Sequence, residues 1–417
     1  MVELLAFAVL GFLLAKTHGH FHPVGIGIIG ILFFVFSVRI FFPTFLSYQT
    51  KSHSIIFSAL VGWFFLFSLW LNSGIIYPTS GASLLAMDVV MGLALMTWLF
   101  FNVNLLTEEK YFSAYISSLV FVLTVALLFF AKILVLHVSP APHIDVFFVN
   151  NMAADFALQG KNPYTQIYPD IYNGAYAYLP SFVYGPPYLW WSIPFRWIFG
   201  DVRYGHVAAE FMTLIGLILF FKKRTNEKSL IYSLGILWLA FPVSLFVLEQ
   251  SWIDPVIIMF YVWLLYFLAN EKYGISAVIA ALLAATKPYS LLVPFLTFIY
   301  LFKIQGGVTA LKWSAICGIV FLLILAPFLL DDASGFYKTT IQWMLNAPLR
   351  TDSLSLPSLW ANVTRQAVPG WLLTLIYLFA LGATAQWLFK NPSRDIRMWI
   401  YSLIILYGAI FLFGKQA

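Results

Sequence analysis

Long apolar runs recur along the whole chain, and this pattern constrains the fold more than any other feature of the sequence. The runs approach the length needed to cross about 30 Å of hydrocarbon. They cover residues 24–46, 53–72, 82–106, 112–136, 204–222, 229–248, 313–330, 371–389 and 398–414. Charged residues make up only 10% of the chain, against about a quarter in a typical soluble domain. The pattern predicts an all-α, polytopic membrane protein.

Charge and cysteine content exclude several other classes. The net charge is +6, but the basic residues lie in short clusters between apolar runs, as in membrane proteins generally, so nucleic acid is not an expected partner. The single cysteine, Cys317, rules out an internal disulfide. Residues 1–15 carry one early charge, Glu3, and no small-residue cleavage site follows. We therefore expect a short first helix there rather than a leader peptide.

Two apolar stretches do not fit a single regular span. Residues 275–302 are too long and are interrupted by Lys287 and Pro288, which predicts two short helices that meet at this break. Residues 182–200 contain three prolines, and only about 13 residues separate the pair Pro186 and Pro187 from Gly200, short of the roughly 20 that a span needs. We therefore expect a helix that lies flat on the membrane. With these assignments the chain has about thirteen transmembrane helices.

Basic clusters fix the expected orientation, because Lys and Arg concentrate in cytoplasmic loops. Four clusters can face the cytoplasm together, at residues 221–228, 270–274, 303–312 and 390–397. The opposite, external face then receives residues 139–203, 249–255, 286–290 and 331–369.

This orientation divides the chain into three consecutive regions. They are the N-terminal transmembrane helices of unassigned role, 1–138, the external loop with two juxtamembrane helices, 139–203, and a transmembrane bundle with a long external loop, 204–417. In the external loop, apolar residues at helical spacing predict a helix over 146–159. Gly160, followed by Pro163, is its expected stop signal.

Ionisable and amide side chains gather on the expected external face. Asp145 follows an apolar run, and Lys287 and Arg350 belong to the same face. Because ionisable groups in or beside membrane spans cost free energy, they are functional candidates by default. The candidate substrate-binding residues on this face are Asn150, Asn162, Tyr164, Glu249, Asp254 and Tyr289.

A carboxylate and cations at a membrane surface suit the transfer of a sugar from a lipid phosphate to a hydroxyl acceptor. A glycosidase needs two carboxyl groups, one of which protonates the leaving group. A phosphate leaving group needs positive charge instead of a proton, and Lys or Arg supplies this charge without a metal. One carboxylate then acts as base on the acceptor hydroxyl. Attack from the face opposite the phosphate inverts the anomeric carbon.

Five stretches, over about residues 143–360, point to a known family. In order, they are HIDVFFVNNMAADFALQGKNPYTQIYPDIY, YAYLPSFVYGPPYLWWSIPFRWIFGDVRY, LEQSWIDP, AATKPYSLLVPF and PLRTDSLSLPSLW. Their content and order resemble the GT-C superfamily of multi-pass glycosyltransferases. The resemblance is to the branch related to polyprenol-phosphate-mannose-dependent mannosyltransferases.

The resemblance implies a GT-C-like fold in which Asp145 is the base and Lys287 and Arg350 lie near the donor phosphate. It implies a polyprenyl-phosphate sugar as donor, a hexose such as mannose as the transferred group, and a glycan, lipid or protein hydroxyl as acceptor. No cofactor or metal is expected. The implied setting is the plasma membrane of a prokaryote, with membrane lipids around the chain and the active site outside.

Simpler roles compete with these assignments. Asp145 would also cap the helix that follows it, and Lys287 would extend its amine to the membrane surface from a helix break. Arg350 would form an ordinary loop ion pair with Asp352. The two acidic residues among the substrate-binding candidates would cap a helix over 255–269.

Two other functions also compete. A lipid-linked saccharide transporter is suggested by the many helices and by buried charge, and it predicts polar groups through both leaflets. A polymerase or ligase that uses a polyprenyl-diphosphate donor would also place cations on the external face.

Overall fold

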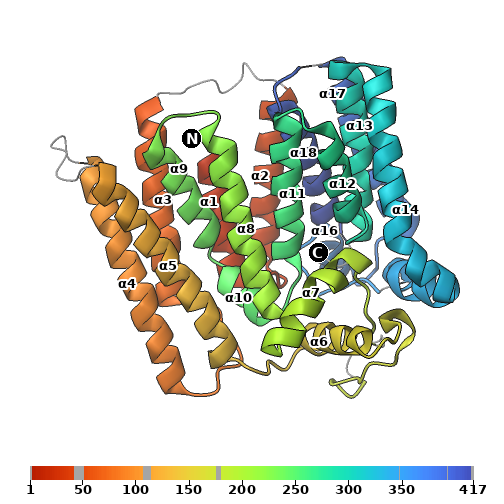
Figure 1. Cartoon of the computed structure of the whole chain (residues 1–417), viewed down its shortest axis with the longest axis horizontal. Helices are drawn as coiled ribbons and strands as arrows, with labels where there is room; N and C mark the ends of the chain where they lie inside the picture. Colours follow the sequence, from red (N-terminus) through yellow and green to blue (C-terminus); the bar gives the residue numbers. More distant parts are fainter. Residues whose placement is uncertain are drawn as a thin grey trace. The chain divides into compact units, whose positions relative to one another are not determined.

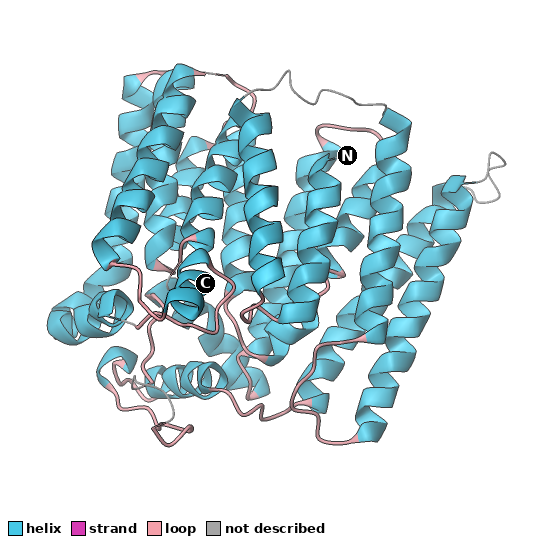
Figure 2. Ribbon diagram, turned by 180° about the vertical axis from the view of Figure 1, so that it is seen from behind, coloured by secondary structure: helices cyan, strands magenta, loops and turns pink. Residues whose placement is uncertain are grey.

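The computed structural model describes residues 2–41, 51–106, 114–174, 180–346, 348–391 and 393–414. Within these ranges the backbone forms helices and loops, with no β-strand (Figure 2). The predicted all-α class is confirmed for this part of the chain. The ends of two expected spans, residues 42–46 and 112–113, lie outside the described residues.

Seven helices in the described ranges are long and apolar enough to cross a membrane. They are Pro23–Phe41, Gly81–Val103, Tyr115–Val138, Arg203–Lys222, Pro288–Gln305, Gly307–Gln342 and Gly370–Lys390. Shorter apolar helices accompany them at Leu4–Thr17, Ile55–Leu71, Lys228–Leu239, Asp254–Ala269, Tyr273–Ala284 and Arg397–Leu412. The chain is therefore a polytopic membrane protein, as the sequence predicts.

The chain folds into two compact units, each assembled from three separate stretches. Unit 1 comprises Met1–His18, Tyr48–Asp155 and Ser192–Val262, and unit 2 comprises Gly19–Ser47, Phe156–Trp191 and Trp263–Ala417. The division passes through three helices, α6 (Asp145–Leu158), α7 (Pro186–Phe199) and α11 (Asp254–Ala269). Both units are discontinuous in sequence, whereas the three regions expected from the sequence are consecutive.

Unit 1 is built mainly from long helices that pack side by side (Figure 1). Its complete helices are α1 (Val2–Thr17), α3 (Lys51–Leu71), α4 (Gly81–Leu106), α5 (Ala114–Val138), α8 (Arg203–Lys222), α9 (Lys228–Leu239) and α10 (Ser244–Glu249). The α4 helix packs against α3 and α5, and α9 packs against α3 and α8. The expected first helix at the N-terminus is present as α1.

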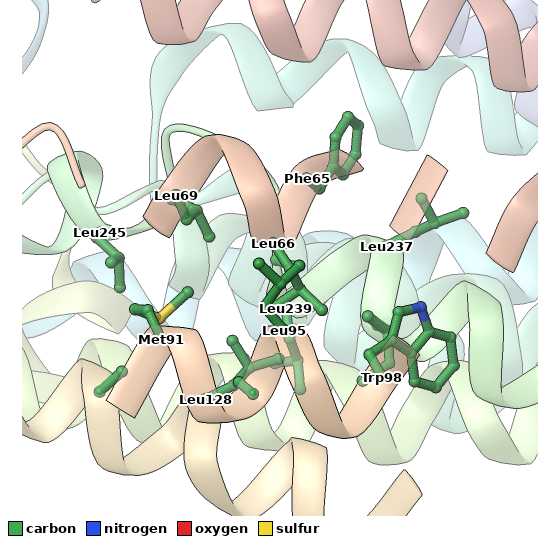
Figure 3. Close-up of a cluster of buried hydrophobic side chains, with 14 of the residues drawn as sticks. Phe65, Leu66, Leu69, Met91, Leu95, Trp98, Leu128, Leu237, Leu239 and Leu245 are labelled. Atoms are coloured by element: carbon green, nitrogen blue, oxygen red, sulfur yellow. The ribbon is translucent and has the colours of Figure 1, made fainter. Parts of the chain in front are cut away.

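Buried apolar side chains from α3, α4, α5, α9 and α10 form the core of unit 1 (Figure 3). Trp98 stacks on Phe101 with ring centroids 4.3 Å apart. Its indole Nε1 donates to the carbonyl of Ala59 at 3.1 Å, so the one polar atom of this ring has a partner. Inside a bilayer, close packing and interhelical hydrogen bonds hold helices together. This core therefore fixes how α3 and α4 pack together.

The expected single span over residues 229–248 is wrong. The structure divides it into α9 and α10, separated by residues 240–243. Pro242 lies in the break, where its ring and missing N–H are incompatible with a continuous helix. The Ser244 hydroxyl donates to the carbonyl of Leu239 at 3.3 Å across the break.

Unit 2 contains the remaining helices. They are α2 (Pro23–Phe41), η1 (Pro163–Thr165), α12 (Tyr273–Ala284), η2 (Pro288–Leu291), α13 (Leu292–Gln305), α14 (Gly307–Tyr337), η3 (Lys338–Gln342), α15 (Trp343–Asn346), α16 (Leu356–Thr364), α17 (Gly370–Lys390) and α18 (Arg397–Leu412). The α14 helix packs against α12 and α13, and α18 packs against α17 and α2. The predicted break in residues 275–302 is confirmed, since α12 ends at Ala284 and α13 begins at Leu292.

The helix α14 extends farther than the expected span 313–330. It continues to Tyr337 with a kink at Asp332, whose φ of −152° and ψ of 89° are not helical. Residues that the sequence assigns to a long loop, 331–369, thus contain the end of α14 and further short helices. The sequence does not predict these helices, because the helix resumes after the kink in residues that look like a polar connection.

Candidate functional site

Asp145 is the first residue of α6, a short helix that follows the membrane-spanning α5. Its side chain is partly exposed, and its Oδ1 accepts a hydrogen bond from the backbone N–H of Val146 at 2.8 Å. The free N–H groups and the dipole of a helix N-terminus stabilise a carboxylate. The capping role suggested by the sequence and a chemical role therefore use the same side chain.

The helix α6 forms and ends as its sequence predicts. Apolar positions such as Val149 and Ala153 are buried on one face, and the chain leaves the helix at Gly160, whose φ is +71°. At the last turn belonging to unit 1, Arg196 binds both carboxylate oxygens of Asp155 at 2.7 Å. This hydrogen bonding raises the pKa of Arg196. The far end of α6 is thus clamped to α7.

Two buried asparagines attach α6 to neighbouring loops of unit 1. The Nδ2 of Asn150 donates to the carbonyl of Ser251 at 3.0 Å. The Oδ1 of Asn151 accepts from the backbone N–H of Val202 at 3.2 Å. Ser251 has a φ of +59°, a conformation that costs free energy for a residue other than glycine. The loop after α10 is therefore held in a strained shape next to α6.

Arg203 joins three loops of unit 1. Its side chain is fully buried, and it forms an ion pair with Asp201 at 2.7 Å. Its guanidinium also donates to the carbonyls of Ser139 at 2.9 Å, Pro140 at 3.3 Å and Glu249 at 3.3 Å. The guanidinium thereby links the start of α8 to the segment before α6 and to the last residue of α10.

Glu249 is fully buried and binds backbone groups. Its carboxylate accepts from the N–H of Ile76 at 2.9 Å and of Tyr77 at 2.8 Å, and from the side chain of Gln250 at 3.1 Å. These bonds give Glu249 a structural role in unit 1, beside the substrate-binding role that the sequence suggests. Asp254, by contrast, is partly exposed at the first residue of α11, where it can cap that helix.

In unit 2, Asn162 and Tyr164 belong to one tightly packed loop. The Nδ2 of Asn162 donates to Asp331 at 2.7 Å. The Tyr164 ring is buried among aromatic rings, with Phe336 at 4.7 Å, and its hydroxyl donates to the carbonyl of Tyr184 at 2.9 Å. Burial, and to a lesser extent a neighbouring tyrosine, hold the pKa of Tyr164 well above its ordinary value. Tyr164 is therefore a neutral phenol that positions the segment at 184.

Lys287 lies at the break between α12 and α13, between two tyrosine rings. Its Nζ is 5.7 Å from the ring centroid of Tyr184 and 5.4 Å from that of Tyr289. Cations are attracted to aromatic faces at such distances. The backbone N–H of Gly185 donates to the carbonyl of Thr286 at 2.9 Å. Unit 2 thus brings together the segments that contain the predicted candidates, at 162–164, 286–287 and 289. The segment 184–185 contacts the first two of them.

Arg350 binds Asp352 through two hydrogen bonds, of 3.1 and 2.8 Å. The hydrogen bonds from Arg350 lower the pKa of Asp352. The carbonyl of Asp352 accepts from the N–H of Phe21 at 2.7 Å, which ties this turn to the residues before α2. The loop ion pair suggested by the sequence is confirmed. The contact with the donor phosphate stays a prediction.

Several residues in these networks are not among the sequence candidates. Arg203 and the buried pair formed by Lys132 and Glu210, 2.6 Å apart, are the main examples. Lys132 and Glu210 have a recognisable signal, an ionisable residue within an apolar span. Arg203 has a weaker signal in the sequence, since it stands at the start of an apolar span, two residues after Asp201.

Comparison of the chain with protein-family models, with curated proteins and with solved structures finds no significant match. Among the residues that the structure describes, no three His, Cys, Asp or Glu side chains form a group that could hold a metal ion. The fold defines a polytopic helical membrane protein.

Proposed function

We propose that this chain is an inverting glycosyltransferase of GT-C type with about thirteen transmembrane helices. It transfers a hexose, mannose being the first to test, from a polyprenyl phosphate to a hydroxyl of a lipid, glycan or protein. The proposed setting is the non-cytoplasmic face of a prokaryotic plasma membrane. The observation that carries the proposal is Asp145, a partly exposed carboxylate at the start of a short helix directly after a membrane span.

In the proposed reaction, the Asp145 carboxylate accepts the proton of the acceptor hydroxyl. The acceptor oxygen forms a bond to the anomeric carbon while the bond from that carbon to the phosphate oxygen breaks. The electron pair stays on the phosphate, so polyprenyl phosphate leaves as an anion. The sugar inverts because the two oxygens lie on opposite faces of the ring.

Lys287 and Arg350 are assigned to the leaving phosphate. Positive charge aimed at the oxygens where negative charge develops lowers the barrier. The two tyrosine rings beside Lys287 support this role, because they hold its ammonium group at the end of a broken membrane helix. Arg350 presents a fork of donors that matches phosphate, with two of them on Asp352.

A donor screen tests the proposal. Purified chain in lipid nanodiscs is given polyprenyl-phosphate hexoses and pentoses together with candidate acceptors, and released polyprenyl phosphate is measured by mass spectrometry. Asp145→Asn is expected to lower the rate by about 10² to 10⁴-fold, the usual worth of a general base. Asp88→Asn, a matched change on α4 of the same unit, is expected to leave the rate unchanged. Normal turnover by Asp145→Asn would remove Asp145 from the base role.

One observation favours a second candidate, a lipid-linked saccharide transporter. The ion pair of Lys132 and Glu210 lies buried inside spanning helices of unit 1, and intramembrane charges often mark transport pathways. Movement of lipid-linked sugar across liposomes without bond cleavage would support this candidate over the transferase. Comparing mono- and diphosphate donors separates a polymerase or ligase from both.

A further inference from the structure

The guanidinium of Arg203 uses every donor it has. Its Nε and one terminal nitrogen bind Asp201, at 3.1, 3.0 and 2.7 Å. The remaining N–H groups reach the carbonyls of Ser139, Pro140 and Glu249. With five donors engaged and no exposed surface, this side chain has a single orientation available to it.

The same side chain also contacts Phe147, which lies on the C-terminal side of Asp145 in the sequence. The guanidinium carbon lies 4.5 Å from the ring centroid of Phe147, within the range of a cation–π contact. Ser139 and Pro140 precede Asp145 in the sequence, and Phe147 follows it by two residues. The segment 139–147 is therefore held at both ends by one buried arginine.

A lysine could not replace this arrangement. Its ammonium would retain the attraction to Asp201, but a point charge on a flexible chain does not match carboxylate and carbonyl groups in several directions. The three carbonyls would then lose hydrogen bonds from a buried donor, and hydrogen bonds from a charged donor are worth more than those from a neutral one. Position 203 therefore requires the planar, forked guanidinium of arginine, and a positive charge alone is not sufficient.

We propose that Arg203 is the positioning residue of Asp145: it fixes the segment 139–147 so that the carboxylate at the start of α6 has one orientation. The assignment rests on the proposed function for its catalytic consequence. Its structural consequence, an ordered segment 139–147, is independent of any activity.

The first test measures order in the segment without an assay of activity. A spin label is attached to Ala141→Cys, an exposed site, in a Cys317→Ala background, and its mobility is read by electron paramagnetic resonance. Arg203→Lys is expected to increase the mobility of the label. Arg196→Lys is the matched control, since Arg196 clamps the other end of α6 through Asp155, and it is expected to leave the label unchanged. An immobile label in Arg203→Lys would overturn the proposal.

The second test separates positioning from folding. We expect Arg203→Lys to lower kcat per folded molecule by about 10- to 100-fold, with the KM for the donor within about threefold of the unsubstituted chain. If kcat per folded molecule were unchanged, Arg203 would be structural only. If the unsubstituted chain transferred no sugar, the proposed function would fail, while the label would still decide whether Arg203 orders the segment.

A milder variant covers the case in which Arg203→Lys does not fold. Phe147→Leu leaves the hydrogen-bond partners of Arg203 in place and removes the aromatic ring, which contacts the guanidinium and the ring of Phe148. It is expected to increase label mobility by less than Arg203→Lys and to lower kcat in the same sense. A label as immobile as in the unsubstituted chain would contradict the proposed anchoring at this end of the segment.

Discussion

Gly185 lies where two backbone segments of unit 2 touch. A Cβ atom at this position would lie 1.6 Å from the carbonyl oxygen of Ala285, and backbone on that side cannot move away like a flexible side chain. The contact joins the segment of Tyr184 to the loop of Lys287. Glycine is therefore required here to bring the ring beside the ammonium group.

Gly185→Ala is expected to separate these two segments. The overlap should destabilise unit 2 by about 3 kcal/mol, the upper end of the cost of overpacking, and lower transferase activity. The melting temperature in detergent and the rate of donor turnover are the measurements. Gly382→Ala on α17, where a Cβ has open space, is the control. Equal melting temperatures for the two variants would contradict the required contact.

At the residue scale, the sequence indicates which side chains are candidates for the reaction, but not which groups hydrogen-bond to them. Asp145, Lys287 and Arg350 are recognisable because ionisable groups are rare in an apolar chain. The partners of Arg203 are not recognisable, because three of them are backbone carbonyls, which every residue has. Only the fold brings Ser139 and Glu249 to the same guanidinium.

At the scale of helices, α5 and α8 share a buried polar seam. Lys132 and Glu210 form an ion pair of 2.6 Å with no more than 3% of either side chain exposed. Arg203, two turns from Glu210 on α8, binds the carbonyl of Ser139, the residue that follows the last residue of α5. The two contacts agree with one antiparallel register, so the pair aligns the helices as well as joining them.

Removing one charge of this pair is expected to be worse than removing both. Lys132→Met should destabilise unit 1 by about 3–5 kcal/mol, because it leaves a buried carboxylate without its partner. Lys132→Met combined with Glu210→Leu should recover most of this loss, since apolar residues of similar volume replace buried pairs well. Thermal unfolding of the variants is the measurement. A double variant as unstable as Lys132→Met would show that the pair contributes net stability.

The ends of helices can be predicted from the sequence where a single local effect, such as a proline or a glycine, decides them. The break at Lys287 and Pro288 and the end of α6 near Gly160 are predicted because proline and glycine act locally. The break at Pro242 is missed because apolar residues on both sides imitate one continuous span. The kink at Asp332 is missed because the helix resumes beyond it, in residues that read as a polar loop.

At the scale of the whole molecule, the proposal depends on the side of the membrane that each loop faces. Single cysteines at positions 145 and 350, in a Cys317→Ala background, are both expected to react with a membrane-impermeant maleimide added outside intact cells. A cysteine at Lys223, within a basic cluster, should react only after the cells are opened. Reaction of positions 145 and 350 from different sides would contradict the proposed orientation of these two loops.

The division into two units could not be predicted from the sequence. Hydropathy identifies segments that enter the membrane, but nearly all of them are similarly apolar, so their pattern does not specify which segments pack together. The residues that do specify it, such as Lys132 and Glu210, are few. Unit 1 and unit 2 therefore emerge only from the packed structure.

The discontinuity of unit 2 has a consequence for biosynthesis. Its helix α2 begins at Pro23, yet it packs against α18, which begins at Arg397. At ordinary translation rates, on the order of half a minute passes between the synthesis of these helices. During this time α2 rests in the bilayer without its native neighbour. The nascent protein thus depends on lipid or an insertion chaperone to cover that surface until the last helix arrives.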